Sequence, residues 1–307
     1  MSEKSSLLDV QKKSIKRMLN LNKNGKSDKI WKVLIIDITG REIISPLFNL
    51  NEIRSFGVTL LLLSNSKKEA VSDAISIYFV EPNKENIDNI LNDLMEDLYR
   101  EYYLNFVSSI SKEMLSYLAK KSLELGVSDK IKSVYDQFSH FQCLEKRLFS
   151  LSIKNSFSKM IKNDQNLAKR IVNGLFDIFV TIKEVPIIKA AKGSMAENIG
   201  RKLAEKIRSR SERNEDLFPK KKFGFSFKRT LLILVDRQID ISTMLHHTST
   251  YQALVHDLLN YQNHQVSLER EDFLKNQKTN STTFELNEND HFWIENKGLP
   301  FMDVASL

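Results

Sequence analysis

The segment from Arg229 to Tyr261, which we call the decisive stretch, reads RTLLILVDRQIDISTMLHHTSTYQALVHDLLNY. It opens with an unbroken apolar run, Leu231–Val235, which is the pattern of a strand buried on both faces of a parallel sheet. Asp236 and Asp240 follow the carboxyl end of that strand, where open α/β sheets usually place their functional groups. An amphipathic helix is predicted to begin near Thr250.

The polar residues of this stretch allow two interpretations. Carboxylates at a strand end, followed by His246, His247 and His256, could form a metal or catalytic site. Alternatively, Asp236, Arg237 and Asp240 pair locally and fix a junction between two parts of the protein. His246 and His247 are adjacent in sequence, which is a poor geometry for chelating one ion. The junction is therefore the favoured interpretation.

Before this stretch, strands and helices alternate along the chain. Such alternation predicts a parallel sheet covered on both faces, and we expect one doubly wound α/β domain over residues 30–139. Its predicted strands are Trp31–Asp37, Leu60–Leu63, Ile75–Val80, Tyr102–Val107 and Lys130–Phe138. Its predicted helices are Asn51–Phe56, a segment with its apolar stripe from Ile87 to Leu98, and Ser111–Leu125.

Three further segments flank this domain. Residues 1–29 form an N-terminal helix and tail, in which a basic amphipathic helix, Leu7–Leu21, is expected to dock its apolar stripe on the following domain instead of lying on a membrane. Residues 140–245 form a second, incomplete α/β domain with a charged linker over residues 209–228. Residues 246–307 begin a helical arm that is truncated, with a polar, loose segment between residues 265 and 283.

The predicted elements of the second domain are strands at Leu148–Ile153 and Val185–Ala190 and a long helix at Leu167–Ile182. A capping box, Ser194 to Glu197, starts a further helix.

Composition limits the function classes. The chain has 307 residues, a net charge of +7 and one cysteine, Cys143, which fits a reducing compartment. No segment approaches the roughly 20 apolar residues that span a bilayer, and we expect a cytoplasmic protein. Basic residues are interspersed with nearly as many acidic ones, and the densest basic run, Lys220–Lys222, lies in the linker without aromatic neighbours. Nucleic-acid binding is therefore not expected.

An α/β nucleotide- or metal-dependent enzyme is the alternative reading of the fold. The first strand is followed by Asp37-Ile38-Thr39-Gly40, and neither a G-x-G-x-x-G nor a G-x-x-x-x-G-K-[ST] loop occurs in the sequence. Lys192-Gly193-Ser194 opens a helix and could hold one anion on backbone amides, although a lone glycine at a helix start is usually a turn. Cys143 lacks the context of a nucleophile. We expect no enzymatic activity and no cofactor.

The stretch VDRQID…MLHHTSTYQALVHDLL resembles the start of the third domain of the Sec/Munc (SM) family, which controls SNARE-driven vesicle fusion. WKVLIID…ISPL, YYLNFVSSIS, VYDQF and VPIIKAAKGSMAE extend the resemblance through the first two domains. Within the family, the chain is most similar to the Sly branch, which serves ER-to-Golgi transport. The resemblance implies a binding scaffold without enzymatic activity. Family members are longer, so the chain looks like a fragment.

The resemblance also implies a binding site for the N-terminal peptide of a Golgi syntaxin. Carried over from the family, that pocket falls on Leu115, Leu118, Ala119, Ile131 and Val134. The first three stand at i, i+3 and i+4, which is one stripe of a helix. Spacing alone would make all five ordinary core residues.

The implied partners are a syntaxin-type Golgi SNARE and SNARE complexes. Membrane association would then be indirect, through SNAREs. The expected protein is a monomer, peripheral on ER and Golgi membranes.

Overall fold

Two units make up the chain, Met1–Asp236 and Arg237–Leu307, and each is described by itself. The computed structural model describes residues 6–21, 31–162, 164–212, 217–218, 230–259, 261–262, 264–271, 278–286 and 290–307. Most of the predicted linker, including Lys220–Lys222, lies outside the described residues.

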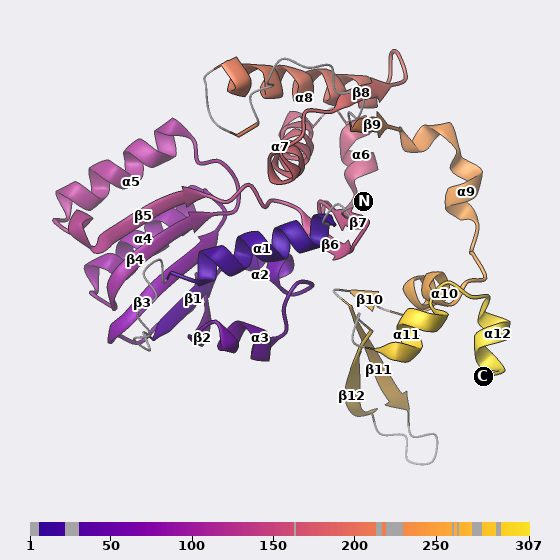
Figure 1. The fold of residues 1–307 in the computed structure, drawn as a ribbon, viewed down its shortest axis with the longest axis horizontal. Coiled ribbons are helices and arrows are strands. Elements are labelled where there is room, and N and C mark those ends of the chain that lie inside the picture. The colour runs from indigo at the N-terminus through magenta and orange to yellow at the C-terminus, as the bar shows by residue number, and fades with distance from the viewer. Residues whose placement is uncertain are drawn as a thin grey trace, which may run out of the picture. The chain divides into compact units, whose positions relative to one another are not determined.

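A five-stranded parallel sheet organises the first unit (Figure 1). Its order is β2-β1-β3-β4-β5, which places the reversal of winding between β1 and β3 and confirms the predicted doubly wound sheet. The strands are β1 (Lys32–Ile36), β2 (Val58–Leu63), β3 (Val71–Val80), β4 (Tyr99–Phe106) and β5 (Ile131–Asp136). β1 is buried along its whole length, because it lies between β2 and β3 in the sheet and has helices on both faces.

Helices cover both faces of this sheet. On one face lie α4 (Lys84–Met95) and α5 (Lys112–Glu124), whose apolar residues join the strands in one core. On the other face lie α1 (Leu7–Leu19), α2 (Ile38–Ile44) and α3 (Leu50–Ser55). The sequence reading missed α2, a two-turn helix that follows β1 directly.

The N-terminal helix α1 docks on the sheet domain as predicted. Its apolar residues Leu8, Ile15 and Leu19 are buried, so this stripe is used inside the fold. The buried ammonium of Lys32 donates hydrogen bonds to the carbonyls of Leu19 (3.0 Å) and Phe56 (2.9 Å), and so ties the ends of α1 and α3 to β1. Desolvation lowers the pKa of Lys32.

In the rest of the first unit two long helices pack against each other, and the second of them covers a small sheet. A hairpin of β6 (Gln142–Glu145) and β7 (Leu148–Ser150) comes first, so the predicted strand Leu148–Ile153 is shorter and pairs antiparallel with a strand that was not predicted. The remaining elements are α6 (Ser156–Ile161), α7 (Gln165–Ile182), β8 (Ile187–Ala190), α8 (Met195–Glu212) and β9 (Leu231–Leu234).

The strand that opens the decisive stretch, β9, is not buried on both faces, and this prediction is wrong. Among the described strands β9 pairs only with β8, in a two-stranded parallel sheet. Leu232 and Leu234 pack towards α8, whereas Ile233 is 62% exposed. Alternation by one residue turns half of the apolar run outward, since α8 covers only one face.

The second unit combines short helices with a three-stranded antiparallel sheet. Its elements are a 3-10 turn (Arg237–Ile239), α9 (Ile241–Leu245), α10 (Tyr251–Leu258), β10 (Tyr261–Gln262), β11 (Gln265–Glu271), β12 (Lys278–Glu285), α11 (His291–Asn296) and α12 (Phe301–Ala305). The predicted helix near Thr250 is confirmed as α10. The prediction of a loose segment over residues 265–283 is wrong, because β11 and β12 pair there.

No helix among the described residues is both long enough and apolar enough to cross a bilayer.

Candidate peptide-binding surface

Helix α5 is fixed at both ends and along its inner side. The Ser111 hydroxyl accepts a hydrogen bond from the Met114 amide (3.2 Å) and caps the first turn. Gly126 follows the last turn with φ of +68°, a conformation that favours glycine. The Tyr117 hydroxyl donates to Asp88 of α4 at 2.7 Å, so α5 is held in register with its neighbour.

The edge strand β5 turns Ile131 and Val134 to the same face of the sheet, although residues three apart on a regular strand face opposite ways. A bulge is the cause. Tyr102 of β4 pairs with Ile131, whereas the next residue of β4 pairs with Ser133, which leaves Lys132 as an extra residue. Both apolar side chains therefore pack towards the core beneath α5.

The structure brings the five predicted residues to one region but gives them different exposures. Leu115 is 42% exposed and Ala119 is also exposed, one helical turn away. Ile131 and Val134 are half-buried. Leu118 is only 2% exposed and belongs to the core between α4, α5 and the sheet. Four of the five can thus touch a ligand directly, while Leu118 supports them from below.

Leu123 was missed by the sequence reading. It is 68% exposed and stands four residues after Ala119, which itself follows Leu115 by four. Leu115, Ala119 and Leu123 therefore form an apolar line along the outside of α5. The four-residue spacing could have revealed it.

Charged side chains surround this apolar surface. Lys121 pairs with Glu124 at 2.8 Å, and Lys130 pairs with Asp97 at 2.6 Å. The hydrogen bond from Lys121 lowers the pKa of Glu124. Lys132 is exposed at the bulge of β5. An apolar centre with charges of both signs at its rim is the usual composition of a peptide-binding site.

The carboxyl edge of the parallel sheet holds a cavity of about 250 Å³ near the ends of β1, β2 and β3. Asp37 there accepts from the Gly40 amide (2.7 Å), the Glu81 amide (2.8 Å) and the Asn86 side chain (2.9 Å). Its two oxygens thus cap α2 and fix the loop after β3. Gly40 is required because a Cβ would lie 2.4 Å from the Phe79 carbonyl oxygen. These residues have structural roles.

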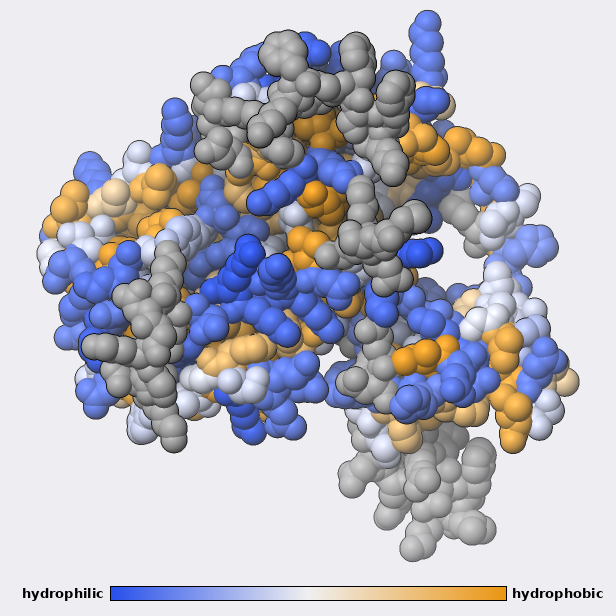
Figure 2. All heavy atoms as spheres, in the orientation of Figure 1, coloured by the Kyte–Doolittle hydropathy of each residue, from blue (hydrophilic) through white to orange (hydrophobic). Residues whose placement is uncertain are grey.

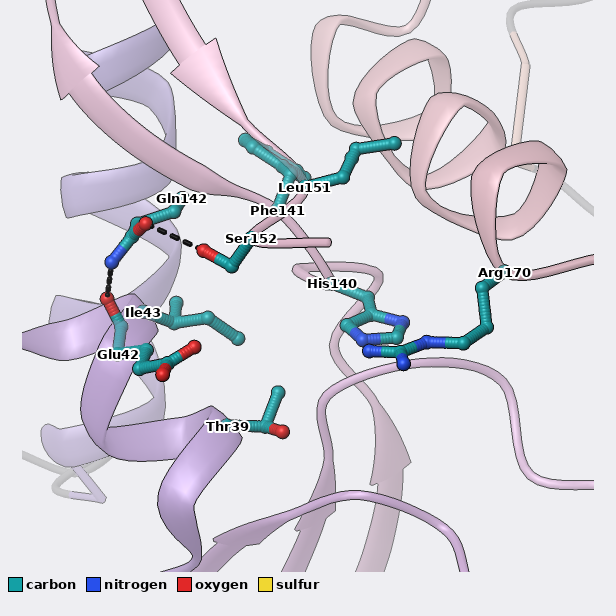
Figure 3. Close-up of a pocket in the computed structure, with 9 residues that line it drawn as sticks. All are labelled: Thr39, Glu42, Ile43, His140, Phe141, Gln142, Leu151, Ser152 and Arg170. Atoms are coloured by element: carbon teal, nitrogen blue, oxygen red, sulfur yellow. Dashed lines mark hydrogen bonds between the residues drawn. The ribbon is translucent and has the colours of Figure 1, made fainter. Parts of the chain in front are cut away.

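A second, smaller cavity of about 30 Å³ lies between α2 and the segment that leaves the sheet domain (Figure 3). The Arg170 and His140 side chains line one side of this cavity, and Glu42 and Thr39 project from α2 on the opposite side. Gln142 donates to the Glu42 carbonyl at 2.6 Å. His140 also pairs with Glu81 at 3.2 Å, and this hydrogen bond lowers the pKa of Glu81. The space suits one water molecule.

The possible anion site at Lys192-Gly193-Ser194 is occupied by the protein's own carboxylates. The Gly193 amide donates to Glu197 at 2.6 Å, and the Ala196 amide donates to Asp236 at 3.4 Å. Ser194 caps the Glu197 amide as predicted. Glu197, however, reaches back to Gly193 instead of Ser194. Asp236 therefore joins the decisive stretch to the start of α8.

The polar residues after Asp236 also have local partners. Asp240 accepts from the Thr243 amide at 3.1 Å and caps α9. His247 lies 3.0 Å from Asp257, which lies 3.5 Å from His256. The hydrogen bond from His247, followed by that from His256, lowers the pKa of Asp257. Across the described residues, no group of three or more His, Cys, Asp or Glu side chains could hold a metal ion.

Two curated relatives and one solved structure are similar to this chain. "Sec1 family domain-containing protein 1" of Rattus norvegicus is 40% identical over 327 residues, covering 98% of this chain and 51% of the relative. "Protein SLY1" of Saccharomyces cerevisiae is 37% identical, covering 98% of this chain and 49% of the relative. The crystal structure of Sly1p in complex with an N-terminal peptide of Sed5p matches with a TM-score of 0.82 and 35% identity, over 99% of this chain and 52% of that chain.

A doubly wound parallel sheet with an apolar outer surface on α5 defines the class of this protein as an α/β scaffold. The Sec1 family model matches residues 32–307. The chain belongs to the Sec1 family, and its resemblance to the Sly branch is confirmed. It spans about half the length of the curated relatives it matches.

Proposed function

We propose that the protein is an SM regulator of SNARE-mediated fusion in ER-to-Golgi vesicle transport, and that it binds the N-terminal peptide of a Golgi syntaxin. The observation that carries this proposal is the exposed apolar surface of α5 and β5, in a chain similar to Sly1p, which was crystallised with an N-terminal peptide of Sed5p. The protein acts as a scaffold without catalysis. It is cytoplasmic and reaches ER and Golgi membranes peripherally, through SNAREs.

The proposed domain boundaries follow the same family. Residues 30–139 carry the peptide site, residues 140–245 form the first segment of the second domain, and residues 246–307 begin the third. Residues 1–29 form an N-terminal helix and tail.

The proposed binding mode is an aromatic anchor held by Leu115, Ala119, Ile131 and Val134. The small side chain of Ala119 leaves room beside its larger neighbours, which is what a ring needs. Burying a ring there contributes a few kcal/mol, at about 25 cal/mol per Å² of apolar area removed from water. Lysine and carboxylate side chains at the rim hold the charged residues of the peptide.

The test is a calorimetric titration with a phenylalanine-containing syntaxin N-terminal peptide. Ala119→Lys should weaken binding at least about tenfold, because a long ammonium side chain fills the place of the ring. Met95→Lys, an equivalent change at an exposed position on α4, should bind like the unmodified chain. The same peptide with Phe→Ala should bind neither protein.

Leu118→Lys is not a usable probe, because it would place an ammonium in the core and unfold the domain. Circular dichroism must show that Ala119→Lys is folded. A folded Ala119→Lys protein with undiminished peptide affinity would remove the site from α5.

A further inference from the structure

The segment from Lys146 to Lys162 concentrates positive charge. It contains five basic residues and no acidic residue in the sequence KRLFSLSIKNSFSKMIK, although the whole chain has a net charge of only +7. The five are Lys146, Arg147, Lys154, Lys159 and Lys162. All are exposed, and in the part of the chain that the structure describes no salt bridge engages them.

Apolar side chains lie among these charges. Leu148 and Phe149 follow the Lys146-Arg147 turn at the tip of the β6–β7 hairpin, and Phe157 and Ile161 lie on α6. Their exposed fractions are between 37% and 52%. Aromatic and aliphatic side chains at a protruding turn, flanked by cations, are the composition of a protein surface that enters a membrane interface.

Helix α1 adds further cations beside the hairpin. It packs against β6 (Figure 1), and it carries the half-buried Lys12 and the exposed Lys13. The pKa of Asp9 in the first turn of α1 is lowered mainly by its hydrogen bond from Ser6, with smaller contributions from the charges of Lys146 and Lys12. The hairpin tip and the start of α1 are therefore neighbours. Figure 2 shows mainly hydrophilic side chains along α1.

We propose that the Lys146–Lys162 segment, with the adjoining face of α1, docks directly on an anionic lipid surface. The basic side chains contact lipid headgroups, and Leu148, Phe149, Phe157 and Ile161 enter the boundary between headgroups and acyl chains. Exposed aliphatic residues favour lipid over nucleic acid, which would use aromatic residues alone for stacking. None of the five cations lines either cavity described above.

This contact is additional to the proposed SNARE binding and uses a different surface. A protein held on SNAREs would be oriented on the membrane by a second, weak attachment. Such attachment is sensitive to salt, because each headgroup contact is screened within about 10 Å at 0.1 M ionic strength.

The first test is flotation of the full 307-residue chain with vesicles of phosphatidylcholine alone or with phosphatidylserine at about a third of the lipid. Binding is expected only to the anionic vesicles and should fall as salt is raised from 50 to 500 mM. Lys146→Glu with Arg147→Glu should weaken it at least about tenfold. Lys112→Glu with Lys120→Glu on α5 makes the same charge change and should bind normally.

The second test reports on insertion. Phe149→Trp places a fluorophore at the hairpin tip, and its emission should shift to the blue on anionic vesicles but not with polyglutamate or single-stranded RNA. A shift with either polymer and none with vesicles would overturn the proposal in favour of an acidic protein or nucleic acid. Equal flotation of the two double variants would overturn it as well. Circular dichroism confirms that each variant is folded.

Discussion

Asp177 on α7 is an acid buried between two parts of the first unit. It is 1% exposed and accepts from the His140 backbone amide at 3.2 Å. Burial raises the pKa of Asp177 to about 7, partly opposed by the nearby charge of Lys206 on α8. Lys206 lies 4.4 Å from the centroid of the Phe176 ring and donates to Asn173 at 2.6 Å, and burial lowers its pKa.

The raised pKa of Asp177 predicts a loss of stability as pH rises. Between about pH 4 and pH 7 the folded state keeps a proton on this group that the unfolded state has released, so the free energy of unfolding decreases across that window. Asp177→Asn keeps an acceptor for the His140 amide but cannot ionise. The variant should therefore gain stability relative to the unmodified protein as pH rises.

Urea unfolding at pH 5 and pH 8 measures this difference. Asp164→Asn, a change at a half-buried acid that caps the start of α7, is the matched control. A stability difference between Asp177→Asn and the unmodified chain that is the same at both pH values would contradict the assignment.

At the scale of elements, the spacing of apolar residues correctly predicted the helices and strands that bury one or both faces in a core. The apolar stripes of α4, α5 and α7 and the runs of β1 and β3 were found because one face, or both, packs in a core. Helix α2 was missed because it is two turns long and its start depends on Asp37, a cap that resembles any strand-end acid. Strand β6 was missed because it is only four residues long, and the hairpin β11–β12 was missed because polar residues dominate it.

The peptide surface shows a different limit of sequence reading. Helical spacing placed Leu115, Leu118 and Ala119 together but could not separate the two exposed residues from the buried one. That distinction depends on the tilt of α5 over the sheet. The prediction that β9 is buried on both faces was wrong for a related reason, since neighbouring strands and helices determine which side of a strand is covered.

The exposure of alternate residues in β9 predicts that substitutions at adjacent positions change the free energy of unfolding by different amounts. Ile233→Thr, on the exposed face, should change the free energy of unfolding by less than about 0.5 kcal/mol. Leu234→Ala should cost about 2–5 kcal/mol, because Leu234 packs on α8 near Gly200. Chemical denaturation of both variants measures the contrast. Equal costs would mean that the outer face of β9 is also covered.

At the scale of the whole molecule, one of the two hydrophobic cores of the first unit is shared between the sheet domain and the elements that follow it. A cluster of buried residues extends from α1 and the sheet through Phe141 and Cys143 to α7 and α8. Burial also raises the pKa of the Cys143 thiol to about 12, which makes it unreactive at neutral pH. The sheet domain therefore shares one of its two faces with the elements that follow it.

A chain ending at Asp236 should accordingly fold by itself and bind the syntaxin peptide as the full chain does. A chain limited to residues 30–139 should be much less stable, because it loses Ile15 and Leu19 from its core and a hydrogen-bond acceptor of Lys32. Thermal unfolding followed by circular dichroism, with a peptide titration on each chain, compares them. Cooperative unfolding of the short chain at the same temperature as the long one would contradict this.

The single extra residue at Lys132 means that the peptide surface does not depend on the exact number of residues in β5. Exchanging Lys132 for another residue leaves the count along β5 intact, and an alanine scan would rank this position as unimportant. Removing the residue would restore regular alternation and leave Ile131 and Val134 two positions apart, still on the same face of the sheet. Related chains can therefore lack a residue at this point of β5 and still keep both apolar side chains on the same face.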